Sequence, residues 1–226
     1  FRGVALDNCS FINCTGISTY SSSLYLYTVN NSRVRESTFE GGYGAGVTIW
    51  DAWDISLQAV NISYNGENLY LSSAHNISLI NTIFVNTTAS YSVTIEASTN
   101  VTFSSCLISD GYLGGVYLSD SQYIVFSDCN ITKNDNFGLI YEPTALLHHL
   151  YLYHCHFSDT NGTGIQIQGG EGFIATWIYI ENCTISGNNG NGILFQDVQN
   201  CTLQNNTIEY NHDHGLDFSG TTSSIN

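Results

Sequence analysis

Basic residues, long apolar runs and paired cysteine motifs are the features that this chain of 226 residues has least of. Lysine and arginine together number four, against 19 aspartate and glutamate residues, which gives a net charge of −15. This charge argues against binding to nucleic acid or to an anionic membrane surface, because both partners require cations. No apolar run reaches the roughly 18 residues of a membrane-spanning helix. We therefore expect no nucleic-acid partner and no membrane span.

The seven cysteines include no Cys-x-x-Cys pair. Domains that depend on a disulfide framework are usually much smaller than this chain, so neither such a framework nor a cysteine metal site is expected. A buried free cysteine behaves as a small apolar residue. We expect free thiols in the core, with Cys9 and Cys14 as the one pair that could be joined.

A repeat of about 23 residues organises the chain, within the range of periods that is typical of solenoids. Short apolar segments recur and are often preceded by a glycine; they begin at Leu24, Val47, Leu69, Val93, Val116, Leu139, Ile165, Ile193 and Leu216. Most steps between these residues are close to that period, and the two steps on either side of Ile165 are longer. A fixed period of this length indicates stacked units that bury a continuous core only against their neighbours.

Each repeat contains three short bursts of alternating apolar and polar residues. In one repeat the apolar positions are Val93 with Ile95, Val101 with Phe103, and Cys106 with Ile108. Alternation with a period of two is typical of strands with one buried face. Serine, threonine, asparagine, aspartate and glycine separate the bursts and favour turns. The pattern predicts an all-β parallel β-helix with three short strands per rung, because a propeller blade would be nearly twice as long.

With these repeats the chain resembles the right-handed parallel β-helix superfamily, the pectate-lyase-like folds, over essentially its whole length. The length and the repeats predict one domain over residues 1–226, a section of a longer chain or a filament subunit, with about nine to ten rungs and a length of about 45 Å. The superfamily includes lyases, hydrolases, phage tailspikes and structural surface proteins, so it does not fix a function. Members of its hydrolase branch carry a set of Asn-Thr-Asp, Asp-Asp, Gly-His-Gly and Arg-x-Lys motifs, and none of these occurs here. We expect a non-catalytic member.

Two sets of residues recur at fixed offsets and predict ladders along the helix. The first set is expected to point inward and to stack on successive rungs: Cys106, Cys129, Cys155 and Cys183. The second falls at a turn: Asn65, Asn134, Asn188 and Asn211. Stacked asparagines can hydrogen-bond along the axis and tolerate left-handed backbone, so a structural role explains them.

Asparagine-x-serine/threonine sequons are unusually dense. They begin at Asn8, Asn13, Asn30, Asn61, Asn76, Asn86, Asn100, Asn130, Asn161, Asn182, Asn200 and Asn205. Alternation in strands produces some polar-apolar-polar triplets by itself. Outward glutamine, lysine or glutamate would satisfy that alternation equally well and is rare. We therefore predict N-glycosylation at several sites, and with it a secreted or cell-surface protein.

Metal and acid–base candidates are less specific. Acidic residues recur after the first strand of several repeats, at Asp51, Glu96, Asp120, Glu142 and Asp197. We interpret them as a solvated edge and expect no cofactor, with weak Ca²⁺ binding as the alternative. Histidines gather at His148, His149, His154 and His156, and again at His212 and His214. An exposed polar corner is preferred over a copper or zinc site. The basic pair Arg33 and Arg35 has Glu36 beside it but no aspartate cluster.

An aromatic stripe is expected on the outer face of the first five rungs. It consists of Tyr25, Tyr70 and Tyr117, with Tyr27 and Trp50 two positions further along their strands. Exposed aromatic side chains over several rungs mark a sugar-binding face or a protein interface, and cross-strand stacking that stabilises the sheet is the alternative.

Neither end of the chain contains an amphipathic cap, and the chain begins at Phe1 without methionine. Open strand edges favour addition of further repeats or of identical subunits end to end. We therefore predict an extracellular, N-glycosylated structural solenoid that forms part of a filament, sheath or stalk. The alternative is a β-helix that binds or cleaves carbohydrate on its Tyr/Trp face.

Overall fold

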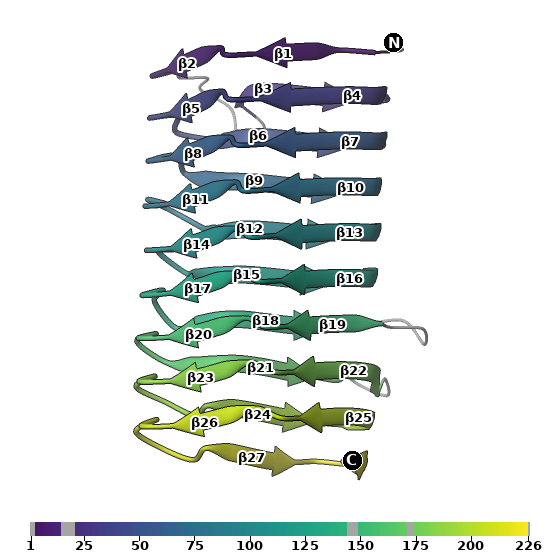
Figure 1. Cartoon of the computed structure of the whole chain (residues 1–226), viewed down its shortest axis with the longest axis vertical. Coiled ribbons are helices and arrows are strands. Elements are labelled where there is room, and N and C mark those ends of the chain that lie inside the picture. The colour runs from purple at the N-terminus through teal and green to yellow at the C-terminus, as the bar shows by residue number, and fades with distance from the viewer. Residues whose placement is uncertain (1–2, 15–20, 144–148, 171–173, 226) are drawn as a thin grey trace.

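The computed structural model describes residues 3–14, 21–143, 149–170 and 174–225. The regular elements in these residues are all β-strands, and they stack into a solenoid of about nine turns (Figure 1). Three parallel sheets, here called A, B and C, run along the whole length. The predicted all-β solenoid with three strands per rung is therefore confirmed. In the described part of the chain, no helix has the length and apolarity needed to cross a bilayer.

Each rung contributes one strand to each sheet. Sheet A contains β1 (Ala5–Asp7), β4 (Asn30–Arg35), β7 (Trp53–Gln58), β10 (His75–Ile80), β13 (Thr99–Ser104), β16 (Gln122–Ser127), β19 (Leu150–Tyr153), β22 (Ala175–Glu181), β25 (Val198–Gln204) and β28 (Ser223–Ile225). Sheet B contains β2 (Ser10–Ile12), β5 (Thr38–Glu40), β8 (Asn61–Ser63), β11 (Ile83–Val85), β14 (Leu107–Ser109), β17 (Asn130–Thr132), β20 (His156–Ser158), β23 (Thr184–Ser186) and β26 (Thr207–Glu209). Sheet C contains β3 (Ser22–Tyr27), β6 (Ala45–Trp50), β9 (Glu67–Ser72), β12 (Tyr91–Glu96), β15 (Gly114–Ser119), β18 (Phe137–Glu142), β21 (Thr163–Gln168), β24 (Ile193–Gln196) and β27 (Leu216–Ser219).

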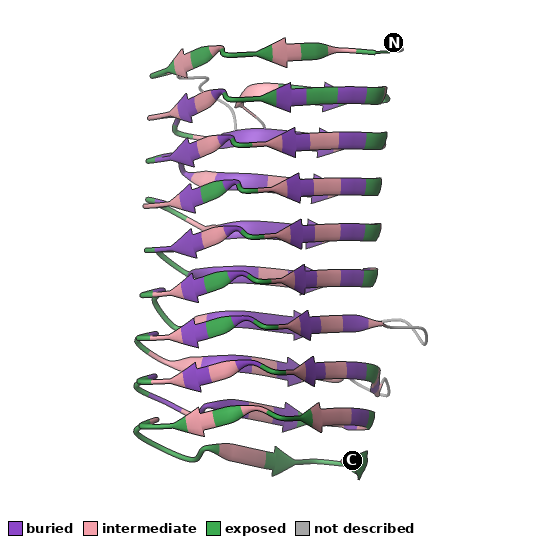
Figure 2. Ribbon diagram, viewed as in Figure 1, coloured by how far each residue is buried: buried purple, intermediate pink, exposed green. Residues whose placement is uncertain are grey.

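The core is a continuous column of side chains between the three sheets. Equivalent positions of successive rungs stack along the axis. Phe103, for example, lies over Phe126 with ring centroids 4.5 Å apart. Figure 2 shows the buried positions aligned from rung to rung, with more exposed residues in the first and last rungs. The alternating pattern of the sequence produces this arrangement because every second residue of a strand points inward.

Left-handed backbone forms the corner between sheets A and B in every complete rung. The nine residues that follow the sheet A strands all have φ between 47° and 54°. They are Asn8, Glu36, Ala59, Asn81, Ser105, Asp128, His154, Asn182 and Asn205. Asparagine and aspartate enter this region more readily than other residues with a side chain, which explains their frequency at the corners.

A glycine lies at or next to the start of many sheet C strands, where neighbouring rungs approach closely. A Cβ atom placed on Gly138 would lie 2.5 Å from the carbonyl oxygen of Gly164 on the next rung. Real side chains do not fit at that distance. The recurrent glycine of the repeat is therefore required by packing between rungs.

The predicted cysteine ladder is confirmed. Cys106, Cys129, Cys155 and Cys183 are buried and free, and the backbone N–H of Cys155 donates to Sγ of Cys183 at 3.4 Å. Cys201 is buried as well, and burial raises the pKa of its thiol to about 12.

The disulfide considered for Cys9 and Cys14 is absent. Both thiols are free, and strand β2 lies between the two residues.

The asparagine ladder forms, but one expectation about it is wrong. Each amide hydrogen-bonds to the preceding rung: Asn134 Oδ1 accepts from the N–H of Gly111 at 2.9 Å, and Asn188 Oδ1 accepts from that of Thr160 at 3.1 Å. The left-handed residue, however, is the one before each asparagine, for example Lys133 before Asn134. The ladder therefore exists because a buried amide satisfies backbone groups at this corner, and not because asparagine tolerates the turn.

Candidate functional site

The outer face of sheet C carries the predicted aromatic stripe. Strand register places Tyr25, Thr48, Tyr70, Thr94 and Tyr117 in one row along the solenoid axis. A second outward row, two positions further along each strand, contains Tyr27, Trp50, Ser72, Glu96, Ser119 and Glu142. The five aromatic residues singled out from the sequence therefore share one face of five successive rungs.

At the N-terminal end of this face the aromatic rings are open to solvent. Tyr25 and Tyr27 are 46% and 53% exposed, and their ring centroids lie 6.1 Å apart. The ring of Trp50 meets that of Tyr27 edge-on, with centroids 6.3 Å apart. Rings exposed in this way offer apolar surface with polar edges, which is the chemistry that contacts sugars and protein partners.

Further along sheet C the tyrosines bind carboxylates of the next rung. The hydroxyl of Tyr70 donates to Glu96 Oε2 at 2.7 Å, and that of Tyr117 donates to Glu142 Oε2 at 3.2 Å. Gln168 Nε2 donates to the other oxygen of Glu142 at 2.6 Å. We call Tyr70, Thr94, Glu96, Tyr117 and Glu142 the Tyr–Glu strip.

Electrostatics keeps the tyrosines of the strip protonated. Burial, followed by the hydrogen bond to Glu96, raises the pKa of Tyr70 to about 12. Burial and the charge of Glu142 likewise raise the pKa of Tyr117. Each hydroxyl therefore remains a donor at neutral pH and holds its carboxylate in a fixed orientation.

Glu67 adds an acid of unusual pKa beside the strip. It is the first residue of β9, is partly buried, and accepts a hydrogen bond from the hydroxyl of Thr94. Burial raises its pKa to about 7, because the charged form loses hydration, and the charge of Glu96 acts in the same direction. Near neutral pH this carboxyl can therefore either hold or release a proton.

Among the residues that the structure describes, this face includes no lysine or arginine to offset these acids. Of the lysine and arginine residues in the described part of the chain, Arg33 and Arg35 lie on β4 of sheet A and Lys133 follows β17 of sheet B. Arg33 instead lies 3.7 Å from Asp7 on the first rung. The site can donate and accept hydrogen bonds and attract cations, but it lacks groups that attract an anion.

The five acidic residues that the sequence suggested as an edge lie in two neighbouring rows. Glu96 and Glu142 end strands of sheet C, whereas Asp51, Asp120 and Asp197 occupy the left-handed positions that follow such strands. In the described residues, no group of three or more His, Cys, Asp or Glu side chains is placed to hold a metal ion. The described acidic residues therefore provide no cluster of ligands for the weak Ca²⁺ binding that was considered as an alternative.

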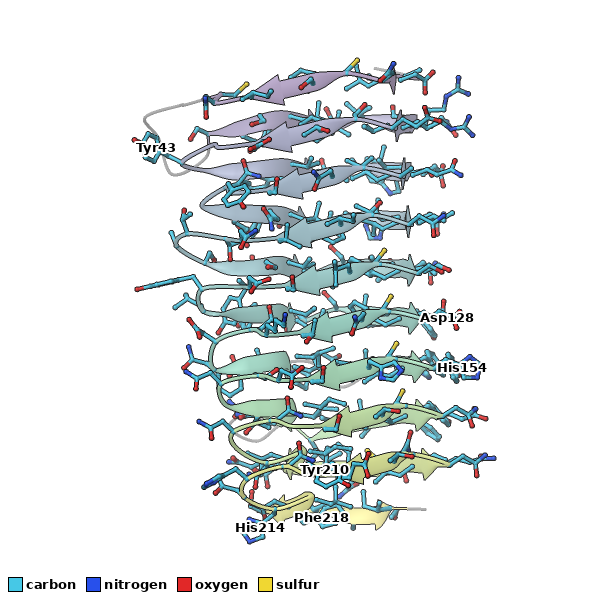
Figure 3. All side chains as sticks on the ribbon, turned by 60° about the vertical axis from the view of Figure 1, so that its left-hand side comes forward. Tyr43, Asp128, His154, Tyr210, His214 and Phe218 are labelled. Atoms are coloured by element: carbon cyan, nitrogen blue, oxygen red, sulfur yellow. The ribbon has the colours of Figure 1, made fainter. Side chains whose placement is uncertain are left out.

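The described histidines form no group that is placed to hold a metal ion. His154 lies at the corner between sheets A and B, 3.5 Å from Asp128, and Figure 3 shows both side chains projecting from the same edge of the solenoid. His156 is exposed, as expected, and so are His212 and His214 near the last rung. His148 lies outside the described residues.

The structure also contains a second aromatic cluster, on the outer face of sheet A, which was not predicted from the sequence. His149 stacks between Tyr123 and Trp177, with centroid distances of 4.5 and 6.1 Å. Tyr151 stacks on Tyr179 at 5.0 Å. Tyr123 and Trp177 lie on β16 and β22, and His149 directly precedes β19 at the equivalent position. An alignment of the second strand of each repeat would have found this row. Glu67 was missed because it precedes the apolar segment used to align the repeats.

The sequon asparagines are explained in large part by backbone geometry. Eight of the 12 have positive φ: Asn8, Asn13, Asn76, Asn86, Asn100, Asn182, Asn200 and Asn205. Asn30, Asn61 and Asn130 each begin a strand, and Asn161 is an exposed turn residue. Since left-handed positions favour asparagine, the density of sequons is weaker evidence for glycans than the count suggests. Glycosylation stays a prediction.

Comparison with known proteins supports the fold. A family model described as the right-handed β-helix region matches residues 45–176 and 148–226. No curated protein sequence matches the chain.

Three solved structures illustrate the likeness. The A-module of the mannuronan C-5 epimerase AlgE4 from Azotobacter vinelandii is 16% identical with a TM-score of 0.66, over 88% of this chain and 63% of that one. The periplasmic alginate epimerase AlgG is 12% identical with a TM-score of 0.67, over 88% and 51%. Pectate lyase Pel9A is 12% identical with a TM-score of 0.66, over 99% and 69%. The chain spans less than two thirds of the two epimerase chains, and identities this low show the fold alone.

Proposed function

The chain belongs to the right-handed β-helix family, and from this premise we propose that it is an extracytoplasmic carbohydrate-binding protein that holds a polysaccharide against the outer face of sheet C. The Tyr–Glu strip and the open rings of Tyr25 and Tyr27 form the contact surface in this proposal.

The observation that carries the proposal is the repeated tyrosine–carboxylate hydrogen bond. Tyr70 with Glu96 and Tyr117 with Glu142 present the same pair of groups twice along one face. Carboxylates held in fixed orientations, next to aromatic rings, suit a ligand with many hydroxyl groups and apolar ring faces, because little side-chain entropy is lost on binding. A polysaccharide has both features.

The comparisons support a carbohydrate ligand over the filament, sheath or stalk expected first from the sequence. The two epimerases and the lyase act, by their names, on mannuronan, alginate and pectate, and one of them is periplasmic. We extend only the general class of ligand and the extracytoplasmic location to this chain. The end-to-end partners and the glycan coat remain sequence-based predictions.

We propose binding without bond cleavage. The chain lacks the four hydrolase motifs, and a polyuronate would meet no lysine or arginine among the described residues of sheet C. Carboxyl groups alone do not define a glycosidase, since catalysis requires a set separation between the acid and its partner.

Affinity electrophoresis in gels that contain neutral, anionic or amine-bearing polysaccharides tests the proposal. We expect at least one polymer to retard the protein and the Tyr117→Ala variant to lose about tenfold in affinity. Tyr210→Ala is the matched control, because Tyr210 is 84% exposed and follows β26 of sheet B (Figure 3). Absence of retardation by every polymer, or equal losses in both variants, would refute the proposed function.

A further inference from the structure

In two outward rows of sheet C, over part of the solenoid, the residue type alternates from rung to rung, so that the same residue type returns every two rungs. In the first outward row, tyrosine alternates with threonine; in the second, glutamate alternates with serine over the four rungs of the strip, after Tyr27 and Trp50 in the two rungs before it. The first row is Tyr25, Thr48, Tyr70, Thr94, Tyr117, and the four positions of the second are Ser72, Glu96, Ser119, Glu142. Both threonines are only 6% exposed although they face outward, and their hydroxyls hydrogen-bond to Ser22 and Glu67.

This alternation gives the surface a longer period than the fold has. Strands of neighbouring rungs lie about 4.8 Å apart, so equivalent groups on alternate rungs are separated by about 10 Å. Glu96 and Glu142 are such a pair, and each accepts a hydrogen bond from the tyrosine one rung before it. The repeated unit is thus one tyrosine hydroxyl and one oriented carboxylate for every two rungs.

A linear polymer that lies parallel to the solenoid axis can match this period. In an extended β-1,4-linked hexose chain, successive sugars face opposite sides, so a given substituent returns to the same side once per disaccharide. The length of that disaccharide is close to the spacing of two rungs. Each oriented carboxylate would then meet the same substituent of the polymer.

The negative charge of the face favours a polymer substituent of positive charge. Glu96 and Glu142 lie in a chain of net charge −15, and no lysine or arginine lies on the described strands of sheet C. A carboxylate or sulfate on the polymer would be repelled, whereas an ammonium group would form a charge-assisted hydrogen bond with each glutamate.

We propose that the ligand of sheet C is an extended β-1,4-linked polymer of amine-bearing hexose, with one amine of every disaccharide placed against Glu96 or Glu142. This inference rests on the proposed carbohydrate-binding function and names the class of polymer.

The test is titration calorimetry with β-1,4-linked glucosamine oligomers of two, four and six sugars, near pH 5.5, where free glutamates are largely ionised. The fully N-acetylated oligomers provide the same backbone without the charge, and mannuronate oligomers provide the opposite charge. We expect the glucosamine hexamer to bind at least tenfold more tightly than its N-acetylated form. This preference should shrink at high salt, because ions screen exposed charges.

Substitution separates the charge from the contact surface. The double variant Glu96→Gln/Glu142→Gln should bind both hexamers equally, since glutamine keeps an acceptor for the tyrosine hydroxyl and removes the charge. Glu209→Gln, on β26 of sheet B, is the control and should keep the preference. Equal binding of charged and N-acetylated hexamers by the wild-type protein, or tighter binding of mannuronate, would overturn the inference and leave carbohydrate binding intact. Failure of every oligomer and polymer to bind would refute the proposed function as well.

Discussion

The outer faces of sheets A and C both carry aromatic side chains, but in different registers. On sheet A the rings occupy consecutive rungs, so that Tyr123, His149 and Trp177 stack with interplanar angles of 12° and 6°. On sheet C the rings of Tyr70 and Tyr117 stand two rungs apart, and their hydroxyls bind glutamates. Stacked rings cover one another's faces, and this also occurs on sheet C, where Tyr91 of β12 stacks on Tyr117 at 5.2 Å. In the row of Tyr70 and Tyr117 itself, however, Thr94 separates the two rings.

The difference indicates separate roles for the two faces. In the sheet A cluster the rings cover one another's apolar faces. The stacking stabilises three successive rungs, as cross-strand pairs stabilise other sheets. In the Tyr–Glu strip the tyrosine hydroxyls donate to glutamates of the same face. The glutamate carboxylates are thereby held in fixed orientations as hydrogen-bond acceptors. Aromatic content and stacking alone would not distinguish these faces; the hydrogen bonds from the hydroxyls of Tyr70 and Tyr117 to glutamates do.

The largest difference expected between the faces is in their response to pH. Glu67 beside the strip has a pKa of about 7 in the folded chain, against 4.5 for the free side chain. Between those values the folded chain keeps a proton that the unfolded chain releases, so stability falls as pH rises across this window. One pKa unit corresponds to about 1.4 kcal/mol, so the loss is at most about 3.5 kcal/mol. Urea denaturation from pH 4 to pH 8 measures it.

The Glu67→Gln variant should lack this loss, because glutamine does not ionise. At pH 8 the variant should therefore be more stable than the wild-type protein, and near pH 4 the two should be similar. Glu181→Gln, on the outer face of sheet A, is the matched control and should follow the wild-type profile. Identical pH profiles for Glu67→Gln and wild type would show that the burial of Glu67 has no energetic consequence.

A smaller effect is expected from breaking the sheet A cluster. Tyr151→Thr removes the ring that stacks on Tyr179 at 5.0 Å, and threonine already occupies the same row in β13 as Thr102. Loss of the aromatic pair should lower the free energy of unfolding by about 1.5 kcal/mol. Affinity for the polysaccharide should not change. A loss of affinity equal to that of Tyr117→Ala would remove the distinction between the two faces.

The fold was predictable from the sequence because its cause is local and repeated. Alternation such as Val93 and Ile95 fixes which side chains point inward, and the regular period of the repeat fixes which of them stack. The position of Cys106 over Cys129 follows from those two facts. The left-handed residue at the asparagine corner did not follow, because the sequence shows that a turn occurs but not which of its residues has positive φ.

The candidate site was predictable only in part. The row of Tyr25, Tyr70 and Tyr117 follows from counting offsets, and so it was found. The raised pKa of Glu67 depends on burial by side chains of other rungs, which no offset reveals. The stack of His149 on Trp177 was hidden by the two longer steps of the repeat, which shift the apparent register in that part of the chain.

The smallest effect is expected from removing one hydroxyl of the strip. Tyr70→Phe keeps the ring and deletes the donor to Glu96, and a hydrogen bond of this kind contributes about 1 kcal/mol. Unfolding free energy should fall by about that amount, and affinity for the polysaccharide should fall about fivefold, because Glu96 loses its fixed orientation. Tyr179→Phe on sheet A is the matched control, since its ring stacks on Tyr151 and should tolerate the change in both measurements. If Tyr70→Phe changed stability but not affinity, the hydroxyl would serve only the sheet; if it changed both, the same hydrogen bond would both stabilise sheet C and prepare its surface for the ligand.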